Sequence, residues 1–221
     1  MKQMIITIDG PGGAGKTTVS RILAEKLGYR YIDTGALYRG IALAVHSARI
    51  DPDDPEQLEN LCKRLDLRFE WNEKGLRLFS GAEDISDRIR TPEITMLASA
   101  VSAQPVVRNC LLKLQRDLGK AGGAVFEGRD MGTVVFPKAD VKFFLDASLE
   151  TRALRRYREL NHTPEVTLEK VTREMKQRDE NDSTRALAPL RPAPDAIRID
   201  SSALSIDEVV SVMLSQIENL C

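Results

Sequence analysis

The sequence lacks the features that mark membrane, secreted and disulfide-rich proteins. None of its 221 residues lies in an apolar run close to the ~20 residues that a membrane-spanning helix needs. Its three cysteines, Cys62, Cys110 and Cys221, are far apart and have neither CxxC spacing nor the density of a disulfide framework. The first residues turn polar too early for a secretory signal. We therefore expect a protein of the reducing cytoplasm that does not contact a membrane.

The sequence also lacks an excess of charge of either sign. Lys and Arg number 32 against 33 Asp and Glu, a formal net charge of -1, and aromatic residues make up only 5%. A nucleic-acid coat needs a basic excess, and a stacking platform needs aromatic rings, so we expect no nucleic-acid partner. Arg outnumbers Lys by 21 to 11, which suits small anions because a guanidinium can give two hydrogen bonds to one phosphate or carboxylate.

Short apolar strands alternate with helical patterns along most of the chain. This order predicts an α/β fold: a five-stranded parallel sheet of the P-loop NTPase type with helices on both faces. The expected strands cover residues 4–8, 29–32, 124–126, 141–145 and 196–199, and helices are expected over 149–160, 168–177 and from a capping box at Ser205–Glu208 onward.

One mid-chain region breaks this alternation. Asp54 and Pro55 begin a helix that is expected to end near Leu65. Residues 66–71 and 76–80 flank a turn over 72–75 and predict an antiparallel hairpin, with a third strand over 83–85. We therefore expect an inserted lobe over 37–104, and a core made of residues 1–36 and 105–221.

A phosphate-binding motif follows the first strand. Residues 10–17 match G-x-x-x-x-G-K-[ST], lie between a strand and a helix, and comprise Gly10, Pro11, Gly12, Gly13, Ala14, Gly15, Lys16 and Thr17. Glycines let the loop turn its amides toward a phosphate, and the helix start adds further N–H groups. Lys16 is expected to reach the β and γ phosphates and Thr17 to bind Mg²⁺. The sequence thus predicts a site for ATP and Mg²⁺ over Gly10–Thr18.

The nucleotide site alone does not distinguish a kinase from a GTPase or a motor. The chain has no Asn-Lys-x-Asp guanine motif, and its strands do not end in the Asp-Glu pair typical of translocases. With these two classes disfavoured, we expect the second substrate to be a small molecule. Three separate segments, each expected at one edge of the sheet, supply Arg39, Arg129 and Arg178, which together favour a second anion site.

The same segments carry a family resemblance that runs over essentially the whole chain. The phosphate loop, Asp33-Thr34-Gly35 with Tyr38-Arg39, the run from Glu127 to Pro137, and Arg178-Asp179 through Arg185 resemble the bacterial cytidylate (CMP) kinases. The run that begins at Gly128 is the most specific of these. The resemblance implies the nucleoside monophosphate kinase fold, with a monophosphate-binding lobe and a short lid near 155–167, and transfer of a phosphoryl group from ATP to CMP or dCMP.

The resemblance also implies roles for single residues. Arg39 and Arg129 match arginines on the acceptor phosphate, and Arg178 and Asp182, with Ser99, match positions near the sugar. Lys16 and lid arginines such as Arg155 and Arg158 would balance the negative charge on the phosphoryl group during its transfer. Positions around the cytosine are matched by Thr34, Ser99, Arg108, Asp130 and Arg185. The family often has Ser at position 34, and Thr34 keeps the hydroxyl.

The residue types agree with cytosine recognition. Asp130 can accept a hydrogen bond from the exocyclic amine of cytosine, and Arg108 can donate to its acceptor edge. UMP would present a carbonyl to Asp130, so we expect UMP to be rejected. Asp33 is a candidate for holding Mg²⁺ through water, and is equally well read as the N-cap of the next helix.

Two other interpretations stay open on the sequence. One is a P-loop kinase for another monophosphate, a sugar or a shikimate-like acceptor. The other is a nucleotide-binding module without catalysis, which would bind ATP but turn over no acceptor. We expect a monomer whose partners are the small nucleotides CMP and dCMP.

Overall fold

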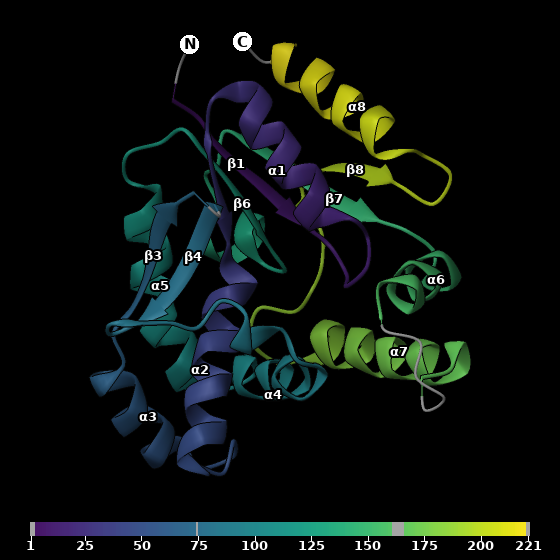
Figure 1. Ribbon diagram of the computed structural model, residues 1–221. Coiled ribbons are helices and arrows are strands. Elements are labelled where there is room, and N and C mark those ends of the chain that lie inside the picture. Colours follow the sequence, from purple (N-terminus) through teal and green to yellow (C-terminus); the bar gives the residue numbers. More distant parts are fainter. Residues whose placement is uncertain (1–2, 74, 161–165, 220–221) are drawn as a thin grey trace. The chain divides into compact units, whose positions relative to one another are not determined.

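A computed structural model describes residues 3–73, 75–160 and 166–219 (Figure 1). Residues 161–165, in the expected lid, lie outside the described part. The chain forms two compact units: unit 1 comprises Met1–Tyr31 and Ala121–Cys221, and unit 2 comprises Ile32–Lys120. Among the described residues, no helix is both long enough and apolar enough to cross a bilayer.

The sheet of unit 1 confirms the predicted five-stranded arrangement. Its order is β2 (Arg30–Asp33), β6 (Ala124–Gly128), β1 (Ile5–Asp9), β7 (Val141–Asp146) and β8 (Ile197–Asp200). β1 pairs in parallel with β6 on one side and β7 on the other, as Figure 1 shows, and β7 pairs in parallel with β8. The central strands are buried almost throughout, which explains their continuous apolar sequence.

In the described part of unit 1, the helices begin or end at residues that favour a helix terminus. α1 (Lys16–Leu27) ends at Gly28 in the left-handed conformation with φ 66°. α6 (Leu149–Glu159) begins at the N-cap Ser148, and α8 (Ile206–Glu218) begins at the predicted capping box of Ser205 and Glu208. A short π-helical turn, η2 (Met131–Val135), follows β6.

The helix α7 (Leu168–Thr184) is longer than the predicted 168–177. Its last turns are rich in Asp, Asn, Ser and Thr, which are weak helix formers, so the sequence favours a loop there. The side chains compensate within the helix: the hydroxyls of Ser183 and Thr184 donate to the Glu180 carbonyl, and Gln177 donates to Asn181. The extension places Arg178 and Asp182 on a helix and not in a loop.

Unit 2 contains the predicted hairpin. β3 (Leu67–Asn72) pairs antiparallel with β4 (Gly75–Ser80), which pairs with the short β5 (Glu83–Asp84). The helices are α2 (Thr34–Ala48), α3 (Pro55–Arg64), α4 (Pro92–Ser102) and α5 (Pro105–Gly119), with the 3-10 turn η1 (Arg88–Arg90) before α4. Proline starts three of these helices, where its missing N–H costs nothing.

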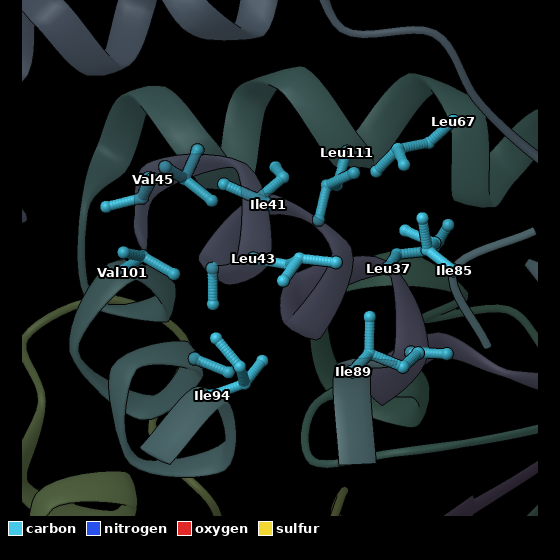
Figure 2. Packing of buried hydrophobic residues seen from close by; sticks show 14 of the residues in the cluster. Leu37, Ile41, Leu43, Val45, Leu67, Ile85, Ile89, Ile94, Val101 and Leu111 are labelled. Carbon is cyan, nitrogen blue, oxygen red and sulfur yellow. The ribbon is translucent and has the colours of Figure 1, made fainter. Parts of the chain in front are cut away.

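The helix α2 forms the centre of the core of unit 2. Figure 2 shows its side chains Leu37, Ile41 and Val45 among those of the surrounding elements, including Val101 of α4 and Leu111 of α5. A methyl group on Gly40 would lie 3.1 Å from Leu78 and 3.2 Å from Leu67, so glycine lets α2 approach the hairpin this closely without a shift of these leucine side chains. Residues of α5 also belong to this core, and the compact unit comprises Ile32–Lys120. The inserted monophosphate-binding lobe over 37–104 stays a prediction.

Candidate active site

The phosphate loop lies between the end of β1 and the start of α1, as the motif predicts. Gly13 and Gly15 have φ of 77° and 90°, in the left-handed region that favours glycine. Lys16 is 7% exposed, and its ammonium donates a 2.6 Å hydrogen bond to the Pro11 carbonyl, across the loop. The loop is thus closed on itself by the lysine that the motif requires.

Two further cations lie over this loop. A methyl group built on Gly12 would be 3.6 Å from Nη1 of Arg178 and 3.7 Å from Nη2 of Arg129. Burial lowers the pKa of Lys16 well below its usual range, and the charges of Arg129 and Arg178 lower it further, against the opposing carboxylate of Glu127. Positive charge is therefore concentrated at one turn of backbone, which is the environment that a polyanion stabilises.

An oxygen pair beside the loop suits a divalent cation. The Thr17 hydroxyl donates a 2.9 Å hydrogen bond to the buried carboxylate of Glu127, the last acidic residue of β6. Hydroxyl and carboxylate oxygens are the donor types that Mg²⁺ accepts alongside water and phosphate. Among the described residues, no group of three or more His, Cys, Asp or Glu side chains forms a separate metal site.

Acidic side chains hold the arginines in place. Nε of Arg129 donates to Asp182 at 3.1 Å, and Nη2 of Arg185 lies 3.9 Å from the buried Asp130. Burial alone would raise the pKa of Asp182, but Arg129, Arg178 and Arg185 hold it below its usual value. Asp182 therefore stays ionised, and the structure brings these five predicted residues together within unit 1.

Asp9 positions the segment that follows β6. Its two carboxylate oxygens accept hydrogen bonds from the backbone N–H groups of Met131, at 2.8 Å, and Gly132, at 2.7 Å. Burial raises the pKa of Asp9 to about 6, and the two backbone hydrogen bonds lower it in part. Asp9 thus fixes the turn that directly follows Arg129 and Asp130, a role for which the sequence carries no signal beyond its place at the end of β1.

The arginines of α6 differ from one another in their surroundings. Arg155 donates to the hydroxyl of Ser201 at 3.1 Å and to its carbonyl at 2.7 Å, and the Ser201 hydroxyl donates to the Ala14 carbonyl of the phosphate loop. Arg158 is exposed in the last turn of α6. Arg152 of the same helix is only 6% exposed and contacts the phosphate loop.

The remaining predicted residues lie in unit 2, in two groups. Asp33 is the N-cap of α2: one oxygen accepts from the Ala36 N–H at 3.0 Å, and the other pairs with Arg39 at 2.7 Å. Burial opposes ionisation, but Arg39 and Arg90 hold the pKa of Asp33 below its usual range. Thr34 is buried at the first position of α2. The N-cap interpretation of Asp33 is confirmed, and its contact with Mg²⁺ through water stays a prediction.

The second group joins α4 and α5. Arg108 donates to the Ser102 carbonyl at 3.1 Å, and its guanidinium carbon lies 5.7 Å from the centre of the Tyr38 ring. Ser99 lies one turn before Ser102, whose hydroxyl donates to the Ser99 carbonyl. Ser99 and Arg108 thus each contact Ser102, at the junction of the two helices.

The fold and the phosphate loop define a nucleotide-binding protein of the P-loop class. The fold is similar to that of a shikimate kinase from Bacteroides thetaiotaomicron, with a TM-score of 0.50 at 16% identity over 97% of this chain and 98% of that chain. A similar likeness, with a TM-score of 0.52 at 13% identity, covers 98% of this chain and 99% of a protein from Eubacterium ventriosum. At these identities the likeness shows the fold alone.

Sequence comparison is far more specific. The profile of the cytidylate kinase family matches residues 6–219. A cytidylate kinase of Geobacter sulfurreducens is 52% identical over 213 residues, 96% of this chain and 91% of that protein. A cytidylate kinase of Aeromonas hydrophila is 46% identical over 221 residues, 99% of this chain and 96% of that protein. The chain belongs to the cytidylate kinase family, as its motifs predict.

Proposed function

We propose that the protein transfers the γ-phosphoryl group of ATP to the phosphate of CMP or dCMP. The bond between the γ-phosphorus and the β,γ-bridging oxygen breaks, a bond to an acceptor phosphate oxygen forms, and the products are ADP with CDP or dCDP. The observation that carries this proposal, besides the family, is the convergence of Lys16, Arg129 and Arg178 at Gly12 of the phosphate loop.

ATP binds in this proposal to the loop over Gly10–Thr18. The loop amides and Lys16 hold its phosphates, and the negative charge of the bound phosphates favours the ammonium form of Lys16. Thr17 would hold Mg²⁺, with Glu127 beside it and with Asp33 as a further candidate through water. When bound, Mg²⁺ supplies neutralisation of charge on the phosphates.

The acceptor nucleotide is assigned to the residues that match the motifs of the family. Arg39 and Arg129 bind its phosphate, and Arg178 and Asp182 bind near the sugar, where ionised Asp182 accepts a hydroxyl hydrogen bond. The base is recognised by Thr34, Ser99, Arg108, Asp130 and Arg185. Buried Asp130 accepts from the cytosine amine, so a uracil carbonyl at the same place would meet a carboxylate.

The mechanism needs alignment and charge more than proton transfer. The acceptor phosphate oxygen is already anionic, so no general base is required. Phosphoryl transfer passes through a loose transition state, whose charge Lys16, Arg129 and Arg178 stabilise, with Arg155 and Arg158 as lid arginines. Closure of the lid near 155–167 would exclude water and limit hydrolysis of ATP.

A coupled assay of ADP release with CMP, dCMP, UMP, AMP, GMP and shikimate in parallel tests the proposal. We expect turnover with CMP or dCMP far above every other acceptor. Turnover with shikimate or a purine nucleotide instead would assign the protein to another kinase activity. Binding of ATP without turnover of any acceptor would favour a non-catalytic nucleotide-binding module.

The compartment and oligomeric state belong to the same proposal. Cys62 and Cys110 are free thiols, which suits a reducing cytoplasm. Each proposed role is assigned to a residue of one chain, so we expect a monomer, which light scattering at assay concentration would check.

A further inference from the structure

Arg152 is a buried guanidinium that the proposed chemistry does not use. It lies in the second turn of α6, and its side chain is 7% exposed. Nε donates to the Ala147 carbonyl at 2.8 Å. Nη1 donates to the Gly12 carbonyl at 3.1 Å and pairs with a carboxylate oxygen of Asp179 at 2.7 Å. Burial of a charged group lowers the stability of the fold unless its partners are well placed, so a role for the buried Arg152 side chain needs to be identified.

The partners of Arg152 connect two parts of the candidate site. Gly12 is the loop residue over which the guanidinium groups of Arg129 and Arg178 lie. Asp179 is the next residue after Arg178 in α7, and Asp182, which binds Arg129, follows in the same helix. One nitrogen atom of Arg152, Nη1, therefore contacts both the phosphate loop and α7, the helix that carries Arg178.

The packing around this nitrogen leaves little freedom. A methyl group on Gly13 would lie 2.9 Å from Met175 of α7, and 3.1 Å from the Cβ and the carbonyl oxygen of Arg152. The loop thus lies directly against both helices. Displacement of α7 by one ångström would move Arg178 away from Gly12, and misplacement of this size can cost about 100-fold in rate.

We propose that Arg152 is a positioning residue that fixes the phosphate loop against α7 and so sets the distance between the bound γ-phosphoryl group and Arg178. This inference deepens the proposed function and rests on it. Arg152 itself touches no reacting atom. If Arg152 only stabilised the fold, its substitution would lower the melting temperature and leave kcat unchanged. As a positioning residue, its substitution lowers kcat in a folded protein that still binds ATP.

The test uses Arg152→Met, Asp179→Asn and the double variant, with Arg173→Met as control. Arg173 is an exposed arginine of α7, the helix that carries Asp179. A misplaced arginine can cost about 100-fold in rate, so we expect kcat to fall by about that factor in Arg152→Met, while the Kd for ATP changes by less than about fivefold. The kcat of Arg173→Met should stay within about twofold of wild type, as is usual for substitution of an exposed side chain.

The double variant shows whether the two residues act together. Asp179→Asn keeps size and should lower kcat by about tenfold, and adding it to Arg152→Met should lower kcat little further, because residues that share one interaction are not additive. Arg152→Lys, which keeps the charge but loses the fork, should recover part of the lost rate.

Three outcomes would overturn the inference. They are a folded Arg152→Met enzyme with kcat within about twofold of wild type, multiplicative effects of the two substitutions, or a lower melting temperature without loss of kcat. If Arg152→Met does not fold, Asp179→Asn is measured in its place, and an unchanged kcat in that variant would overturn the inference. Wild-type protein that does not phosphorylate CMP would refute the proposed function itself, and with it this inference, so the two failures are distinguishable.

Discussion

Replacement of Arg129 by alanine should separate acceptor chemistry from ATP binding. Two of its nitrogen atoms are occupied: Nε donates to Asp182, and Nη1 donates to the Gly128 carbonyl at 3.2 Å. Nη2 of Arg129 lies 3.7 Å from a methyl position on Gly12. Nη2 carries two N–H groups, and two charge-assisted hydrogen bonds from them to phosphate, each contributing about 1.5–3 kcal/mol, amount to at least about 3 kcal/mol. At about 1.4 kcal/mol per factor of ten, this is a loss of more than 100-fold in kcat/KM for CMP.

The same substitution should barely weaken ATP binding. Of the neighbouring charges, Arg129 lowers the pKa of Lys16 most, so its removal lets Lys16 hold its proton more readily. Asp182 keeps Arg178 and Arg185 as neighbouring charges, so the protein should fold. We therefore expect a Kd for ATP within about fivefold of wild type, since the loop amides and Lys16 remain to bind phosphate.

Steady-state turnover against CMP concentration, with calorimetric titration of ATP, makes the comparison. Arg129→Lys serves as the control for charge, and should fall between wild type and alanine because it keeps the charge without the fork. CMP turnover close to wild type in Arg129→Ala would refute the assignment of Arg129 to the acceptor. Equal losses in CMP turnover and ATP affinity would also contradict it.

Three other predictions rest on single residues of unit 1. Lys16→Met should lose at least about 1,000-fold in turnover yet melt no lower than wild type, because it removes a buried cation whose pKa is lowered by its surroundings; retained turnover in the coupled assay would contradict this. Asp130→Asn should raise the ratio of UMP to CMP turnover by about tenfold or more, because the amide can donate to the uracil carbonyl, and an unchanged ratio would count against its role. The pKa of Asp9 is raised to about 6, so its contribution to stability is complete below pH 3.8 and is lost as the pH rises through 6. Between pH 5 and pH 7, the free energy of unfolding of the wild type, measured with urea, should therefore fall by roughly 1 kcal/mol relative to that of Asp9→Asn. If the two proteins show parallel pH profiles, Asp9 does not titrate between pH 5 and pH 7.

The parts of the molecule that were predicted correctly depend on local sequence. The strand before Gly10, the glycines of the loop and the helix from Lys16 follow from a motif whose residues are neighbours in the chain. The hairpin over β3 and β4 follows from alternation and a turn. The N-cap role of Asp33 was one of two local alternatives, and the backbone of Ala36 decides it.

The parts that were not predicted depend on contacts between distant residues. Whether Arg152 is buried is set by Gly12 and Asp179, which are 140 and 27 positions away, so its own helix gives no sign of it. Asp9 likewise takes its role from backbone amides more than 120 positions later. The full length of α7 was missed because Ser183 and Thr184 satisfy their hydroxyls inside the helix, which outweighs their weak propensity.

The most direct test of the account follows the phosphoryl group itself. Purified protein is incubated with Mg²⁺, CMP and ATP labelled at the γ-phosphate, and the labelled products are separated. We expect the label to move to the β-phosphate of CDP, with little free phosphate, and we expect Lys16→Met to abolish this transfer. Label that stays in ATP, or that appears only as free phosphate although CMP is present, would contradict it.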